Sequence, residues 1–577
     1  MLKILKYFKW WEWLWVLVIF GLLGLQVYCS LSLPEFMEDI VAGIYSVYFG
    51  MSKISDLIII GLKMLGVIVG EILCTIVVSY IAAYIITSLC ARIRENVFKK
   101  VNSFSMSEIN NFSIPSLITR STNDITQIQH VLVILLRMGF LAPITFIGAI
   151  IKIIGKSNQL SLITIFSVLA LVLLIAIMIT FVVPKFKILQ KNTDNINLVT
   201  RENLTGLRVV RANNAEKHQE EKFENVNKVL TKTNLFVNRV TSIMGPGMSL
   251  VFSGTSLAIV WFSAHLINNG TISPEIMTSF TSYAMQIITS FMFLSMLFIM
   301  IPRGQVCANR INKVLESKSS IIDGSGVSET KLKGQVEFKN VSFKYPDADG
   351  YILKNISFKA EQGETVAFIG STGSGKSTLI NLIPRFYDAT EGEILIDGEN
   401  IKNYKIEELN NILGYVPQKG ILFSGSIREN VKYGNQNATD EDVEKALKVA
   451  CAEFVNKLPE KLDYRISQGG KNVSGGQKQR LSIARAVAKN PEIYIFDDSF
   501  SALDYKTDKE LRKRLKEHTK NATSLIVAQR IGTIRNADKI IVLNDGEMVG
   551  YGKHDELIET CEIYKEIALS QLSKEEL

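Results

Sequence analysis

Charged residues are scarce in this chain of 577 residues, where 21% are charged and 47% are hydrophobic. So little charge is unusual for a water-soluble protein. Nearly all of the long apolar runs fall before about residue 302, whereas the Gly-rich and charge-rich segments follow it. A chain of this length also exceeds what one hydrophobic core serves, so more than one domain is expected.

Cysteines are few and scattered, with no CxxC pair and no metal-ligand spacing. This pattern indicates free structural thiols in a reducing compartment and argues against a metal cluster. The formal net charge of +8 is not accompanied by a basic stripe with interleaved aromatic residues, so nucleic acid is not an expected partner. Lys and Arg beside membrane segments explain the excess more simply.

Six apolar runs are long enough to cross a bilayer. They lie at roughly Trp13–Leu33, Leu57–Leu89, Val131–Ile154, Leu160–Val183, Met248–Ile267 and Ile276–Ile301. Buried helices of a large soluble protein are the alternative, but six such runs leave too little polar surface for that. The first run follows three lysines, as in a signal peptide. No small-residue cleavage site follows it, so we expect this helix to be retained.

The connections between these runs are unequal in length. About forty residues separate spans two and three and about sixty separate spans four and five, and both segments carry many basic residues. The positive-inside rule places both long loops and both termini in the cytoplasm, with the six spans in a lipid bilayer of the cell membrane. Residues 1–302 are thus predicted to form a transmembrane domain with two long cytoplasmic loops.

A different periodicity begins after a polar linker, predicted at residues 303–333. From Val336 the sequence VEFKNVSF alternates like a half-buried strand, and strands and helices then alternate to the end. This pattern predicts an α/β domain of the P-loop type over residues 334–577.

A phosphate-binding loop stands early in this second domain. Residues 370–377 fit G-x-x-x-x-G-K-[ST]. They follow the strand-like run ETVAFI and lead into the helix-like run STLINLI. Their backbone N–H groups are expected to surround ATP phosphates, with Lys376 reaching the β- and γ-phosphates and Ser377 ligating Mg²⁺. The candidate ATP-binding residues are Gly370, Ser371, Thr372, Gly373, Ser374, Gly375, Lys376, Ser377 and Thr378.

The apolar run Ile493–Phe496 ends in Asp497 and Asp498, like a buried strand that delivers a carboxylate. Alone, such a strand end would more often be a structural turn. After a phosphate-binding loop, Asp497 becomes the expected carboxylate near Mg²⁺.

A third motif, Val-Ser-Gly-Gly-Gln, begins about twenty residues before that strand. It resembles the signature motif of the ABC ATPase superfamily. Six spans with two long loops before it are similar to an exporter-type half-transporter of the multidrug-resistance kind. Through this resemblance, a second nucleotide contact is expected at Ser474, Gly475, Gly476 and Gln477.

The resemblance also implies roles for isolated residues. Tyr345 matches the aromatic residue that stacks on adenine. Gln418 matches the glutamine that senses the γ-phosphate and contacts the membrane domain, and it is expected to ligate Mg²⁺ together with Ser377 and Asp497. Ser501–Asp504 matches the D-loop. Short coupling helices are expected at the tips of the long loops, near Ile114–Ser121 and Arg201–Leu207.

The sequence departs from the family at its two catalytic positions. Asp498 stands where the family usually has Glu, and Gln529 stands where it usually has His. Asp holds its carboxylate one methylene further back, and Gln cannot carry the charge of an imidazole. Gln468 also replaces a usual Glu in the cross-domain loop. The pattern resembles the degenerate-site subunit of heterodimeric bacterial exporters, whose partner bears the missing Glu and His.

We therefore expect an ATP hydrolase that exports small hydrophobic or amphipathic molecules, with Asp498 and Gln529 as its weakened catalytic pair. Aromatic and methionine side chains in the sixth span suit such ligands. Glu71 within the second span would favour amphipathic cations if it lines the cavity. A homodimeric exporter of a specific lipid or peptide, or an ATP-gated regulator that does not pump, remains the alternative.

Overall fold

The computed structural model describes residues 1–327 and 330–572. Two compact units make up the chain. One contains residues 1–102 and 115–317, and the other contains residues 103–114 and 318–577. Residues 328 and 329 of the predicted linker and residues 573–577 of the predicted α/β domain lie outside the described residues.

The regular secondary structure of the first unit is all helical in its described residues, as the apolar runs predict. Six helices are long and apolar enough to span a membrane, which confirms the expected six-span fold class. They are α2 (Trp10–Tyr48), α3 (Ile54–Asn102), α6 (Asn123–Ile153), α7 (Asn158–Thr205), α9 (Glu216–Asn268) and α10 (Pro274–Glu316). The short helices are α1 (Leu2–Leu5), α5 (Ile114–Ser121) and α8 (Leu207–Ala212).

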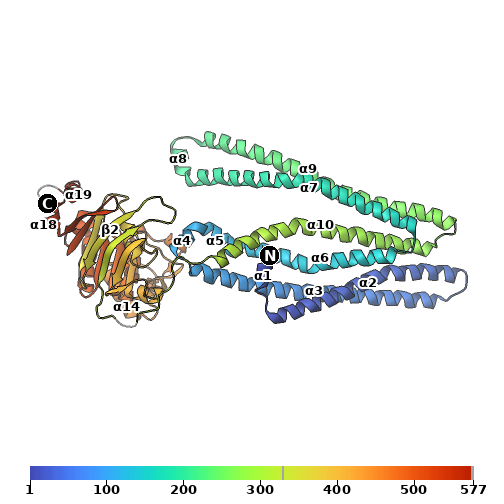
Figure 1. Cartoon of the computed structure of the whole chain (residues 1–577), viewed down its shortest axis with the longest axis horizontal. Coiled ribbons are helices and arrows are strands. Elements are labelled where there is room, and N and C mark those ends of the chain that lie inside the picture. Colours follow the sequence, from blue (N-terminus) through green and yellow to red (C-terminus); the bar gives the residue numbers. More distant parts are fainter. Residues whose placement is uncertain (328–329, 573–577) are drawn as a thin grey trace. The chain divides into compact units, whose positions relative to one another are not determined.

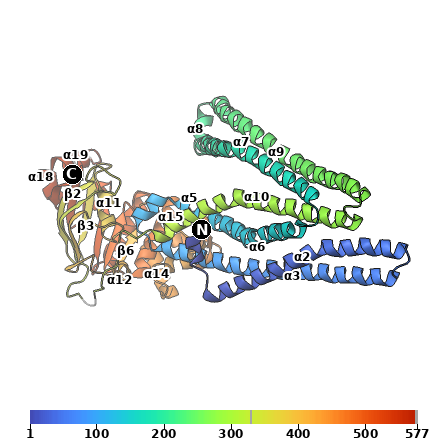
Figure 2. The same cartoon turned by 45° about the vertical axis from the view of Figure 1, so that its right-hand side comes forward.

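The long helices pack mainly in pairs. Helix α7 lies along α9, with α8 joining their ends, and α6 lies along α10 while α2 lies along α3 (Figure 1). A second view shows the same pairs (Figure 2). The 53 residues of α9 extend about 80 Å at 1.5 Å per residue, far more than a bilayer requires. Helix α10 continues to Glu316, so the first half of the predicted linker, residues 303–316, is helical.

The second unit is the predicted α/β domain. Its strands are β1 (Val336–Phe343), β2 (Leu353–Ala360), β3 (Thr365–Gly370), β4 (Glu391–Ile396), β5 (Glu399–Asn400), β6 (Leu413–Val416), β7 (Gly425–Ser426), β8 (Arg465–Ile466), β9 (Ile493–Asp497), β10 (Thr523–Val527), β11 (Lys539–Asn544) and β12 (Glu547–Gly552). Its α-helices are α4 (Met106–Phe112), α11 (Lys376–Leu382), α12 (Ile406–Ile412), α13 (Ile427–Lys432), α14 (Asp440–Val449), α15 (Gly475–Lys489), α16 (Tyr505–His518), α17 (Ile531–Ile534), α18 (His554–Thr560) and α19 (Glu562–Leu569). Three 3₁₀ turns complete it: η1 (Glu453–Lys457), η2 (Lys461–Asp463) and η3 (Gln468–Gly470).

Two main sheets form this unit. The larger has the strand order β12-β11-β3-β10-β9-β6, in which the five strands from β11 to β6 are parallel. The smaller is antiparallel, in the order β2-β1-β4-β5. Parallel strands covered on both faces need apolar side chains on both faces, and all five residues of β9 are buried.

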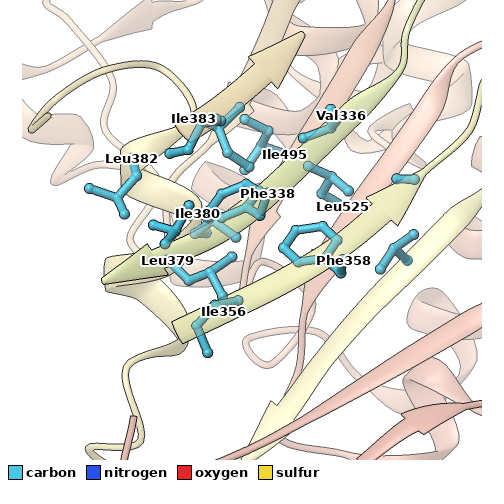
Figure 3. Packing of buried hydrophobic residues seen from close by; sticks show 14 of the residues in the cluster. Val336, Phe338, Ile356, Phe358, Leu379, Ile380, Leu382, Ile383, Ile495 and Leu525 are labelled. Atoms are coloured by element: carbon cyan, nitrogen blue, oxygen red, sulfur yellow. The ribbon is translucent and has the colours of Figure 1, made fainter. Parts of the chain in front are cut away.

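Helix α11 supplies much of the core that joins the two sheets. Its Leu379 and Ile380 are fully buried in one cluster with Phe338 of the antiparallel sheet and Ile495 of the parallel sheet (Figure 3). Packing on both sides fixes the start of α11, and with it the loop that precedes it. The carboxyl ends of the parallel strands gather at the same edge, where ligands of open α/β sheets usually bind.

Candidate functional site

The phosphate-binding loop connects β3 to α11 through a backbone that requires glycine. Gly370 has φ +155° and Gly375 has φ +93°. A Cβ on Gly370 would lie 2.0 Å from the carbonyl oxygen of Leu543, which excludes any side chain there. The loop thus curls tightly at the N-terminus of α11, where backbone N–H groups and the helix dipole favour phosphate.

Lys376 places its ammonium group inside this loop. Its Nζ donates to the carbonyl oxygens of Gly370 at 2.9 Å and Ser371 at 2.7 Å, and to Ser374 Oγ at 3.2 Å. Burial lowers the pKa of Lys376, while the charges of Asp498 and Asp497 oppose this shift. The loop therefore holds a cation beside the N–H groups that would receive phosphate oxygens.

Ser377 and Asp497 form the expected oxygen pair. Ser377 Oγ donates to Asp497 Oδ1 at 2.8 Å, across the 120 residues that separate them. Burial raises the pKa of Asp497, and the bond from Ser377 acts in the opposite direction. A carboxylate and a hydroxyl fit Mg²⁺, which prefers oxygen ligands and takes its remaining ones from substrate phosphates and water. Within the described residues, no group of three His, Cys, Asp or Glu could hold a metal alone.

The two catalytic positions that depart from the family lie in direct contact. Asp498 follows β9, and its backbone N–H donates to the carbonyl oxygen of Val527 at the end of the neighbouring β10. Gln529 Nε2 donates to Asp498 Oδ2 at 2.8 Å, and Gln418 Nε2 donates to the same oxygen at 3.3 Å. Burial raises the pKa of Asp498, opposed first by the bond from Gln418.

Gln418, which the sequence also predicts as a metal ligand, contacts Asp498 and not the Ser377–Asp497 pair. One carboxylate oxygen therefore receives two neutral amide donors. Asp498 itself is 7% exposed and has φ +46°. Its side chain is confined by the turn after β9 and by both amides.

Tyr345 lies beside the same loop. Its hydroxyl is 3.1 Å from Thr378 Oγ1, and its ring meets that of Tyr387 edge to face at a centroid distance of 5.2 Å. Both rings pack against the core formed by the two sheets. The predicted adenine-stacking residue is thus anchored to the first turn of α11.

The signature residues cap a separate helix, α15. Ser474 Oγ accepts from the Gln477 N–H at 3.3 Å, and Gln477 Oε1 accepts from the Ser474 N–H at 2.9 Å. Ser474 and Gly475 are exposed. In the part of the chain that the structure describes, no hydrogen bond joins Ser474–Gln477 to the phosphate-binding loop. This helix start is accessible to another molecule.

The first long loop forms a short helix at the predicted segment Ile114–Ser121, which is α5. The preceding segment, residues 103–114 with α4, is the part of this loop that groups with the nucleotide unit. In the second long loop, α8 begins at Leu207, where the predicted segment ends.

Two residues that the sequence did not single out complete this part of the unit. Asn110 Nδ2 of α4 donates to the hydroxyl of Tyr387 at 3.0 Å, and Tyr387 contacts Tyr345. The Glu108 carboxylate fixes α4 by accepting from the backbone N–H groups of Ser105 and Ser320. The sequence Ser-x-x-Glu of this capping box was a usable signal for α4.

Known proteins resemble the chain along nearly its whole length. A family model described as the ABC transporter transmembrane region matches residues 16–291, and one described as ABC transporter matches residues 353–501. An uncharacterized ABC transporter ATP-binding protein of Mycobacterium tuberculosis (strain CDC 1551 / Oshkosh) is 37% identical, covering 94% of this chain and 93% of its own length.

A second relative is a multidrug resistance ABC transporter ATP-binding and permease protein of Lactococcus lactis, which is 30% identical over 84% of this chain and 82% of its own. The fold matches a solved structure of a bacterial Atm1-family ABC exporter with ATP bound, with a TM-score of 0.80 at 23% identity. That match covers 97% of this chain and 98% of the other. The chain belongs to the ABC transporter family, as a multi-pass membrane protein that carries its own ATPase domain.

Proposed function

We propose that this protein exports hydrophobic or amphipathic small molecules across the cytoplasmic membrane as one half of a heterodimeric ABC exporter. In this proposal its own ATP site, formed with its Walker residues, turns over slowly. The observation that carries the proposal is the pair of glutamine amides on Asp498 Oδ2. Asp498 stands where a faster site would have the longer carboxylate of Glu, and Gln529 stands where it would have a histidine.

ATP would bind with its phosphates in the loop from Gly370 to Ser377 and its adenine against Tyr345. Lys376 would exchange its present carbonyl acceptors for phosphate oxygens, because charge-assisted bonds to phosphate are the stronger ones. Thr378 would hold the Tyr345 hydroxyl and so fix the orientation of the ring.

Mg²⁺ would be held by Ser377 and Asp497, and when bound it would supply positive charge to the β- and γ-phosphate oxygens. Asp497 is suited to this role because burial makes its uncompensated charge unfavourable, so a cation that neutralises the charge is favoured. Ser377 already orients the carboxylate through its hydroxyl.

Hydrolysis needs a base that orients water in line with the γ-phosphate. General-base assistance typically contributes about 10²–10⁴ in rate, and displacing the base by one methylene forfeits part of it. Gln529 can donate a hydrogen bond but cannot carry a proton, so it adds no positive charge as phosphate leaves. Slow turnover at this site follows from both changes.

The signature helix would act on the partner's ATP. Its N-terminal N–H groups are exposed at Ser474 and Gly475, and the dipole of the 15-residue α15 favours an anion there. Two chains arranged head to tail would each complete the other's site. A partner bearing Glu and His would then hold the faster site, completed by Ser474–Gln477 of this chain.

The substrate class rests on the membrane unit. The Lactococcus lactis relative is named for multidrug resistance, and Glu71 lies half-buried in α3. A carboxylate within a membrane-spanning helix is costly unless it serves a ligand or a partner. We propose amphipathic molecules as substrates. We further propose that residues 1–302 house the transport path, that residues 334–577 form the nucleotide domain, and that both termini are cytoplasmic.

Restoring the missing groups tests the weak-site assignment. The double variant Asp498→Glu with Gln529→His should raise the ATP turnover of the purified, detergent-solubilised chain by about tenfold or more, within the span of general-base effects. Lys376→Ala should return turnover to background, which verifies that the measured activity belongs to this site.

A wild-type chain that hydrolyses ATP as fast as the double variant would contradict the weak-site assignment. A wild-type homodimer that transports dye in proteoliposomes as fast as a two-component exporter would contradict the heterodimer. Co-purification with a second chain that carries Glu and His would support it.

A further inference from the structure

The contact between Gln529 and Asp498 depends on backbone that lies beyond the end of β10. Gln529 comes two residues after Val527, the last residue of that strand, and just before α17 begins at Ile531. Both Gln529 and Arg530 are exposed. A second structural element is therefore needed to hold this short connection in place.

Gln571, close to the C-terminus, makes that connection. Its Nε2 donates to the carbonyl oxygen of Gln529 at 2.8 Å, and its Oε1 accepts from the backbone N–H of Ile531 at 2.8 Å. The two bonds engage the backbone on both sides of Arg530. The side-chain amide of Gln571 thus bridges the connection between β10 and α17.

The position of Gln571 is fixed by α19. Tyr564 and Ala568 of α19 are fully buried in the cluster that also contains Ile531 and Ile534 of α17. The backbone N–H of Gln571 donates to the carbonyl oxygen of Ala568, which continues the helix end. Helix α19 and the connection after β10 therefore share one core.

We propose that Gln571 is a positioning residue for ATP hydrolysis, which clamps the backbone on both sides of Arg530 and so holds the Gln529 amide against Asp498. The series of contacts runs from Gln571 to the Gln529 backbone, and from the Gln529 side chain to Asp498. This inference rests on the proposed role of Asp498 and Gln529 at the ATP site. It assigns a role in that site to the C-terminal helix.

Three full-length variants test the clamp. Gln571→Ala removes both bonds, and Gln571→Glu keeps the acceptor for the Ile531 N–H but loses the donor to Gln529. Gln362→Ala is the matched control, because Gln362 is also exposed and its Nε2 also donates to a backbone carbonyl, that of Asn521. Amide hydrogen exchange of the peptide 528–534, thermal unfolding, and the kcat and KM for ATP are measured for each.

Gln571→Ala should speed exchange in the peptide 528–534 about five- to tenfold, as expected for the loss of a typical hydrogen bond. It should lower kcat about three- to tenfold with KM within twofold and the melting temperature within 2 °C. Gln571→Glu should keep the slow exchange of the Ile531 N–H yet lower kcat. Gln362→Ala should match wild type.

Unchanged exchange in Gln571→Ala would overturn the clamp, whatever the turnover. Faster exchange with unchanged kcat would overturn the positioning role. A fall in kcat accompanied by a large drop in melting temperature would mean that Gln571 acts only on stability. If the wild-type chain failed to bind ATP, the proposed function would fail, whereas the exchange comparison would still decide the clamp.

Discussion

Gln529 Nε2 donates to Asp498 Oδ2 at 2.8 Å, so the two catalytic positions that depart from the family pattern are hydrogen-bonded to each other. An amide and a short carboxylate are complementary at this separation. If only one of the two residues were replaced, by Glu at position 498 or by His at position 529, the new side chain would have to fit against the unchanged residue at the other position. The two departures therefore form one unit.

The first prediction concerns this coupling. Each substitution, Asp498→Glu or Gln529→His, should raise ATP turnover less when it is made alone than when the other substitution is already present. Residues in direct contact usually show interaction energies of about 0.5–3 kcal/mol in such cycles. Initial rates at saturating ATP, measured for the wild type, the two single variants and the double variant, give this interaction energy. Strictly additive effects would show that the contact has no energetic role.

Local sequence patterns were sufficient to predict the parts of the site that one strand and its turn create. The run TVAFIG is apolar and ends in glycine, and it forms β3. The run IYIFD likewise forms β9 and carries Asp497 to the edge of the sheet. Six apolar runs sufficed for the six helices because backbone groups in a bilayer must be satisfied within the helix.

Contacts between distant segments could not be predicted in this way. No periodicity links Gln571 to Gln529, because the link depends on how α19 packs beside α17. Asn110 and Tyr387 lie 277 residues apart in the sequence. Their contact depends on how the whole unit folds, which the sequence around either residue does not reveal. The polar composition that begins near residue 303 likewise does not reveal that α10 stays helical through Glu316.

The second prediction is a pH dependence of stability that arises at Asp397. This residue is 6% exposed in the turn after β4, and burial raises its pKa from 3.8 to about 6. Because the pKa is higher in the folded chain, the stabilisation is complete below about pH 4 and is lost as the pH rises through 6. A shift of about two pKa units corresponds to at most about 3 kcal/mol.

Asp397→Asn should therefore raise the melting temperature of the nucleotide domain at pH 7.5 and leave it unchanged near pH 4. Asn keeps an acceptor for the Gln335 N–H, which lies 2.8 Å from Asp397 Oδ1, and it tolerates φ +54°. Asp545→Asn is the control, since Asp545 has φ +44° before a glycine but is exposed. Equal shifts in both variants at pH 7.5 would rule out burial as the cause.

The third prediction concerns the loop between the second and third spans. Tyr387→Phe keeps the ring beside Tyr345 but removes the hydroxyl that Asn110 contacts. ATP affinity should stay within twofold, whereas stimulation of the ATPase by a transported dye should fall threefold or more. Tyr351→Phe, which removes an exposed hydroxyl bound to Glu391, should change neither quantity. Loss of ATP affinity in Tyr387→Phe would show that the hydroxyl supports the nucleotide pocket instead.

The fourth prediction concerns the N-terminal segment of the membrane unit. Glu12 of α2 is fully buried, and its Oε2 accepts from the Arg92 guanidinium and from the Lys9 N–H. Arg92 also donates to the carbonyl oxygen of Tyr7 and to Ser88 Oγ, so it ties the segment before α2 to α3. Removing one partner of a buried pair typically costs about 3–5 kcal/mol, because the other charge is left uncompensated.

Arg92→Ala should therefore lower the melting temperature of the detergent-solubilised chain markedly, and adding Glu12→Gln should recover most of the loss by removing the isolated charge. Lys99→Ala provides the comparison. Its ion pair with Glu95, four residues earlier on the same helix, is exposed at both ends, so its loss should change the melting temperature little. A double variant no more stable than Arg92→Ala would show that the packing of the guanidinium, and not its charge, holds the segment to α3.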